Sequence, residues 1–193
     1  MAVGNSSAGI QITCKNSTVN EIRVRTELDF LIRKYNLKNY FFTDAVIINE
    51  SADNPHSHPV LTLNTRHLGK EHILLSTFIH EQIHWYAVQH FHKIKLAIQE
   101  LKIIYPIVPV GYPNGARDEF SSYLHIIINW LELDSLYQIL EKIQYEEVVN
   151  FLQSDHYTWI YKIVISDYEI IKEKLDKYGI QLKTSKGGEE RYE

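Results

Sequence analysis

Apolar residues recur at two different spacings along the chain, and the change of spacing divides the chain into two parts. Residues 43–49 contain a β-branched run, and residues 59–65 alternate between apolar and polar, as half-buried strands do. From residue 70 onward, apolar residues return every three or four positions, which is the spacing of one helix face. Strands followed by helices predict an α+β fold, with a small N-terminal sheet and a mainly helical body.

Breaks in the helical spacing separate the expected helices from one another. Prolines and glycines at 106–115 predict a rigid loop in the middle of the helical part. Thr26 is the expected N-cap of the first helix. The expected helices are 26–36, 70–93, 116–133, 145–152, 157–165 and 167–178.

Length and composition predict one domain with loose ends. A chain of 193 residues, 45% hydrophobic and 23% charged, is long enough to bury a core without covalent crosslinks. Residues 1–20 are rich in Ser, Asn and Gly, so we expect a flexible N-terminus or a loose strand there. Residues 21–182 form the expected single domain, and the charged segment 183–193 is expected to be disordered.

Charge and cysteine content exclude several classes of function. A formal net charge of −4 without a dense basic patch argues against nucleic acid or an anionic membrane as the main partner. The single cysteine, Cys14, excludes an internal disulfide and thiolate-rich zinc sites. The sequence shows neither a signal-peptide pattern nor a run of about 20 apolar residues, so we expect a cytoplasmic protein.

The most informative motif is His-Glu-x-x-His at residues 80–84. On a helix, side chains four residues apart lie on the same face, so His80 and His84 can bind one metal ion. Glu81 lies about 100° around the helix from His80, where it can act as general base on a metal-activated water. The surrounding residues are largely apolar, and imidazoles and a carboxylate are costly there without partners. The motif therefore predicts a zinc hydrolase site.

A catalytic zinc site needs a third protein ligand, and His90 is the nearest candidate. His90 has the spacing of the metzincin signature, but that signature requires a glycine at position 87, where this chain has Ala87. The Met-turn of that group is also excluded, because Met1 is the only methionine. Peptide deformylase is excluded as well, since Cys14 is unsuited to be its cysteine ligand.

Glu119 is the preferred third ligand. With it, the chain resembles the thermolysin-like gluzincins, zincin metallopeptidases in which a glutamate on a later helix completes the histidine pair. The resemblance covers only the motif helix and its partner. It departs from that group at Tyr123, where those proteins often have an aspartate that orients a ligand. Helical phase places Glu119 in line with Tyr123, Ile126 and Trp130, on an apolar face where a carboxylate needs a cation.

Two neighbours of Glu119 stay open as alternatives. Asp118 is either a ligand or an ordinary cap of the helix. His125 is an alternative third ligand or a residue that orients one, because it shares a polar stripe with other residues of the same helix. That stripe is either a solvated face or the wall of a cleft; it comprises Asp118, Ser121, Ser122, His125, Asn129 and Glu132.

The resemblance also implies a substrate and further catalytic groups. In gluzincins a downstream histidine or tyrosine donates a hydrogen bond to the oxyanion, and His156 and Tyr157 are the candidates here. Strand 59–65 resembles the zincin edge strand that pairs with an extended peptide, which favours a peptide or protein substrate. The loop 50–58 contains His56 and His58, and we expect it to be a solvated turn.

The sequence thus predicts a cytoplasmic zinc peptidase with Zn²⁺ as its cofactor. Glu81 is its expected general base, and Glu119 is expected to complete the metal site. The alternative function is a metal-binding domain without catalysis, or a helical protein-interaction domain in which His80 and His84 are structural.

Overall fold

A small parallel sheet lies at one end of the molecule. The computed structural model describes residues 9–182. Three strands, β1 (Gln11–Cys14), β2 (Ala45–Ile48) and β3 (Leu61–Leu63), lie in that order, and Val46 at the centre of β2 faces Ile12 and Leu61. Helix α1 (Val19–Lys34) connects β1 to β2 and packs on the sheet, and a 3₁₀ helix (Leu37–Tyr40) precedes β2.

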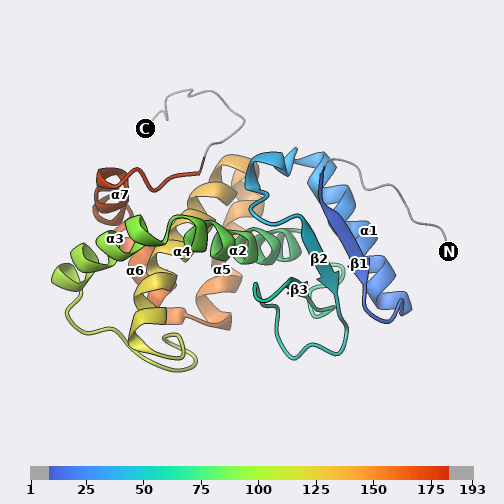
Figure 1. The fold of residues 1–193 in the computed structure, drawn as a ribbon, viewed down its shortest axis with the longest axis horizontal. Coiled ribbons are helices and arrows are strands. Elements are labelled where there is room, and N and C mark those ends of the chain that lie inside the picture. The colour runs from blue at the N-terminus through green and yellow to red at the C-terminus, as the bar shows by residue number, and fades with distance from the viewer. Residues whose placement is uncertain (1–8, 183–193) are drawn as a thin grey trace.

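The rest of the described chain is helical. Figure 1 shows α2 through the centre, the sheet and α1 to its right, and α3 and α7 toward the left. One cluster of buried apolar side chains extends from Ile10 to Ile180 and joins the sheet to the helices. The α+β prediction is confirmed. The helices are α2 (Glu71–Gln89), α3 (Phe91–Ile104), α4 (Glu119–Ile139), α5 (Lys142–Asp155), α6 (Thr158–Ser166) and α7 (Tyr168–Lys177).

The N-terminal region is more ordered than the sequence suggested. Part of the segment expected to be flexible forms β1, and α1 begins at Val19 with Thr18 as its N-cap, not at Thr26. The buried Glu21 accounts for this order. Its carboxylate accepts hydrogen bonds from the backbone N–H groups of Asn16, Thr18 and Glu50, which fastens the start of α1 to the end of β2. The expected tail, 183–193, lies outside the described residues.

The long motif helix predicted over 70–93 is two helices in the structure. It is interrupted at His90, whose backbone leaves the helical region and whose Nδ1 lies 2.9 Å from the carbonyl oxygen of Tyr86. Beyond this break, α3 packs against α4 and α7. Among the helices of residues 9–182, none combines the length and apolarity needed to cross a membrane.

The outer edge of β3 is partly occupied by the chain itself. Thr62 uses both of its backbone groups to pair with His56, at 2.8 and 2.9 Å, in an antiparallel bridge. The segment that contains His56 therefore lies where a peptide substrate was expected to pair with strand 59–65. That expectation is corrected at Thr62, because its N–H and C=O groups are already bonded.

Candidate metal centre

Helices α2 and α4 pack side by side in opposite directions. Ser76, near the start of α2, donates a hydrogen bond to Glu132, in the second half of α4. Phe91, just after the end of α2, lies against Phe120 at the start of α4, so the two helices are antiparallel. The helical spacing that places His80 and His84 on one face of α2 directs both of them at α4. The contact between the two helices therefore determines which α4 side chain meets the histidine pair.

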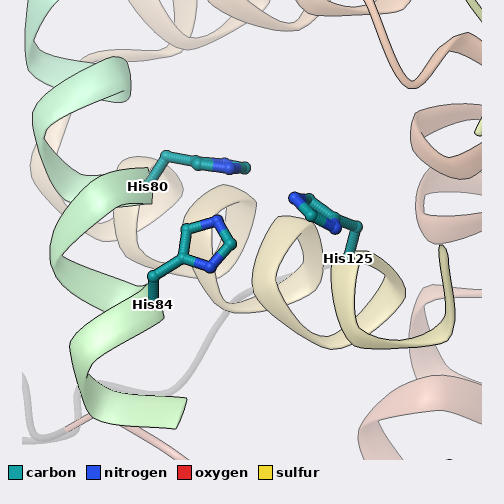
Figure 2. Close-up of side chains that lie close together, drawn as sticks. All are labelled: His80, His84 and His125. Carbon is teal, nitrogen blue, oxygen red and sulfur yellow. The ribbon is translucent and has the colours of Figure 1, made fainter. Parts of the chain in front are cut away.

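His125 is the α4 residue that meets the pair. One nitrogen from each of His80, His84 and His125 lies within 4.8 Å of the other two, an arrangement able to hold a metal ion. Figure 2 shows the three rings converging from the two helices. His84 and His125 have ring centroids 5.1 Å apart, and His80 and His125 5.7 Å. The structure thus brings together the predicted pair and the residue that was the alternative ligand.

Glu119 lies elsewhere. Its side chain is exposed, and its Oε1 accepts a hydrogen bond of 2.8 Å from Lys102 Nζ on α3. The expected position of Glu119 is therefore wrong, and the cation that its carboxylate needed is a surface lysine. Asp118 is the N-cap of α4 and accepts a hydrogen bond from the backbone N–H of Ser121, which is the capping role considered for it.

Two of the three imidazoles are held so that one nitrogen is left for a metal. His80 donates its Nδ1 hydrogen to Glu132 Oε2 at 2.9 Å, and His125 donates its Nδ1 hydrogen to the Ser121 carbonyl at 2.7 Å. In the neutral form of each ring, the Nε2 atom then carries the lone pair that a metal needs. Hydrogen bonds of this kind orient histidine ligands in metal sites, so the donor set fits a metal ion.

Glu132 is the centre of the buried network behind His80. In addition to the His80 imidazole, its carboxylate accepts hydrogen bonds from Ser76 Oγ at 2.5 Å and from Tyr161 Oη at 2.8 Å. Three donors from α2 and α6 compensate for burying this charge. Sequence reasoning placed Glu132 on a polar stripe with His125 but assigned it no separate role.

Replacing Glu132 with alanine is expected to weaken metal binding about 10- to 100-fold, because His80 loses the acceptor that orients it. Glu132→Gln keeps the side-chain shape and should give a smaller loss. Titration with zinc, followed calorimetrically, measures the change. Glu119→Gln on the same helix is the control and should bind like the wild type. Equal affinities for Glu132→Ala and the control would contradict this role.

Burial keeps two of the histidines neutral. It lowers the pKa of His84 well below its usual value and that of His125 to about 3, and the other imidazoles of the cluster act in the same direction. For His80, burial also favours the neutral ring, but the negative charge and hydrogen bond of Glu132 outweigh burial and raise its pKa. Neutral imidazoles are the form that binds metal, so His84 and His125 present lone pairs, whereas a metal ion has to displace a proton from His80.

Glu81 lies next to the cluster, and its pKa is raised above the usual value of a carboxylate. It is buried and lines the same cleft as the three histidines. Burial raises its pKa to about 7, although the charge of His80 opposes the shift. A carboxylate with a pKa near neutrality can both accept and release a proton at physiological pH, which is the property required of a general acid and base.

His156 and Tyr157 lie on the same cleft. The Tyr157 ring is 4.2 Å from the His125 ring, centroid to centroid, and its backbone is in the left-handed region at the start of α6. Burial and then Glu81 raise the pKa of the Tyr157 phenol to about 12, so it remains a hydrogen-bond donor. Asp155 links His156 Nδ1, at 2.6 Å, to Arg66, at 2.7 Å, which orients the His156 ring.

The cleft has a volume of about 1000 Å³. His56 and His58, expected to lie in a solvated turn, line it together with the motif residues. The His58 ring stacks on Trp85 with centroids 4.3 Å apart, and the Trp85 indole donates to the Ser57 carbonyl. Sequence reasoning missed that this loop lines the cleft, and its two histidines were the available signal.

Comparisons with known proteins identify no relative of this chain. No protein-family model matches it, and neither the curated proteins nor the solved structures contain a significant match.

Proposed function

We propose that this protein is a zinc-dependent hydrolase that acts on a peptide or protein substrate. The observation that carries the proposal is the convergence of His80, His84 and His125 beside the buried Glu81 at an open cleft. A set of three histidines suits zinc among the common metals, and a site with three protein ligands leaves a position for catalysis.

Zinc held by the three imidazoles would polarise a substrate carbonyl and make water a better nucleophile near neutral pH. The carboxylate of Glu81 would take the proton of the attacking water and then pass it to the departing amine. The position of Glu81, buried on the cleft beside the three histidines, supports both steps. The resulting roles resemble those predicted from the motif, with His125 in the place that was expected for Glu119.

Tyr157 would stabilise the oxygen that gains negative charge during the reaction. Tyr157 Oη is a protonated donor, and its ring contacts His125. His156 gives its Nδ1 hydrogen to Asp155, and burial lowers its pKa, so its Nε2 atom is an acceptor and the predicted donor role falls to Tyr157. A peptide substrate is supported by the size of the cleft and by the resemblance of the motif helix to zincin peptidases.

Hydrolysis of a mixed peptide library by the zinc-loaded protein tests the proposal. We expect cleavage to stop when a chelator removes the metal and to return when zinc is added in stoichiometric amount. Mass spectrometry of the products would detect cleavage of amide bonds. Cleavage that persists in the chelated protein would contradict the proposal, as would a zinc-loaded protein that cleaves none of the peptides.

A further inference from the structure

A buried histidine outside the candidate metal centre lines the same cleft. His67 follows β3 and is 6% exposed. Its Nδ1 is buried and has no hydrogen-bond partner within residues 9–182. The ring of His67 packs edge-on against Phe151 of α5, with centroids 5.6 Å apart. The wall of the cleft thus holds a buried polar side chain without the partner that normally compensates for burial.

The neighbours of His67 on the cleft are polar as well. We call the group of Arg66, His67, Asp155 and His156, all of which line the cleft, the polar cluster. Asp155, at the end of α5, accepts hydrogen bonds from Arg66 at 2.7 Å and from His156 Nδ1 at 2.6 Å. The next residue in the chain, Tyr157, has its ring 4.2 Å from that of His125, centroid to centroid. The polar cluster therefore lies beside the metal centre.

The polar cluster carries no net charge. The guanidinium of Arg66 is paired with the carboxylate of Asp155. Burial lowers the pKa of His67 to about 4, and the charge of Arg66 acts in the same direction. Burial also lowers the pKa of His156, so both rings are uncharged at physiological pH. A charged group of a ligand would need a further partner here, whereas an uncharged polar group would not.

The polar cluster offers both donors and acceptors of hydrogen bonds. Arginine has several N–H donors, and the bond to Asp155 uses one of those of Arg66. His156 Nε2 is an acceptor, and the neutral ring of His67 has one donor and one acceptor. A carboxamide matches this set, because its oxygen accepts and its NH₂ group donates. A carboxylate only accepts, and an aliphatic side chain does neither.

We propose that the polar cluster binds the side-chain carboxamide of an Asn or Gln residue of the substrate. The inference rests on the proposed hydrolase function and places this residue near the cleaved bond. The carboxamide oxygen accepts a hydrogen bond from Arg66 or His67, and the NH₂ group donates to His156 Nε2. A site of this kind rejects analogues that lack the polar group, because its own buried polar groups are then left unpaired.

Hydroxamates test the polar cluster without requiring catalysis, because the hydroxamate group binds zinc. The probes are hydroxamates of N-acetylated Asn, Asp and Leu, whose side chains are similar in size, and a longer series with Gln, Glu and Met. Calorimetric titration into the zinc-loaded protein measures each affinity. In at least one series, we expect the wild type to bind the carboxamide about fivefold or more tighter than the acid and the aliphatic analogue.

His67→Leu is expected to reduce this preference to less than about twofold, because the ring that bonds the carboxamide is gone. The variant should unfold at the wild-type temperature or above it, since it removes an unpartnered polar group from a buried position. His72→Leu is the matched control and should keep the full preference. His72 also has a buried nitrogen without a partner in the described part of the chain, but it is not among the residues that line the cleft.

The outcomes separate the polar cluster from the metal centre. A wild-type protein that binds acetohydroxamate but does not prefer the carboxamide in either series would overturn the inference and leave the proposed function standing. Preference for the acid would also overturn it and assign a carboxylate to the cluster. So would an undiminished preference in His67→Leu. Failure of acetohydroxamate to bind would contradict the metal centre, and the inference with it.

Discussion

The Glu81→Gln variant is expected to bind zinc like the wild type and to lose hydrolytic activity by a factor of about 100 to 10,000. Glutamine has nearly the same shape as glutamate, so the cleft and the three histidines should be preserved. Its amide cannot accept the proton of the attacking water. The loss should appear in kcat, because the carboxylate acts during the reaction and is not needed to bind the metal.

Measurements on the variant and on a control variant distinguish this result from a general loss of structure. Zinc content and thermal unfolding of Glu81→Gln should match those of the wild type. Glu71→Gln, at the exposed start of the same helix, should retain full activity. A Glu81→Gln protein with wild-type kcat would show that this carboxylate is not the general base. Loss of zinc in the variant would place Glu81 among the metal ligands.

His125→Ala is expected to weaken zinc binding at least about a hundredfold, whereas Glu119→Ala should bind zinc with unchanged affinity. Second-sphere changes alone cost about 10- to 100-fold, and removal of one of three ligands should cost more. The physical difference between the two residues is their position. His125 is buried against His80 and His84, and Glu119 is at the surface with Lys102.

Zinc titrations of both variants provide the comparison. Because His125 is buried, its removal also leaves a small cavity, so the fold of the variant has to be checked by circular dichroism before titration. His125→Gln retains a polar side chain of intermediate size and should also bind poorly. A larger loss of zinc affinity for Glu119→Ala than for either His125 variant would contradict the three-histidine centre. It would instead assign the third ligand to Glu119, in the first turn of α4.

The sequence predicted the parts of this molecule that depend on local spacing. The two strands at 43–49 and 59–65 and the change to helical spacing gave the α+β fold. The pairing of His80 and His84 follows from helix geometry alone, since four residues make about one turn. Both predictions need no knowledge of how the helices pack.

The third member of the histidine cluster depends on packing between helices that are distant in sequence. Glu119 and His125 are both on α4, and only the register of α4 against α2 places His125 opposite His84. The separate helix α3, which follows the break at His90, carries the Lys102 that meets Glu119. A single sequence does not contain that register, so the choice between the two residues could not be settled from it.

The polar stripe on α4 shows the same limit. Helical spacing grouped His125 with Ser121 and Glu132 and left open whether they faced solvent or a cleft. In the structure all three line the cleft, and Glu132 fixes the ring of His80. Periodicity can identify which residues share a face, but the neighbour of that face is set by tertiary packing.

X-ray absorption spectroscopy at the zinc edge tests the central claim most directly. The wild-type protein should hold one zinc per chain, with three imidazole nitrogens at about 2.0–2.1 Å and the scattering pattern of imidazole rings. The spectrum of His125→Ala should lose one imidazole, and that of Glu119→Ala should be unchanged. A wild-type spectrum with two imidazoles, or a protein that does not bind zinc stoichiometrically, would contradict the three-histidine metal centre.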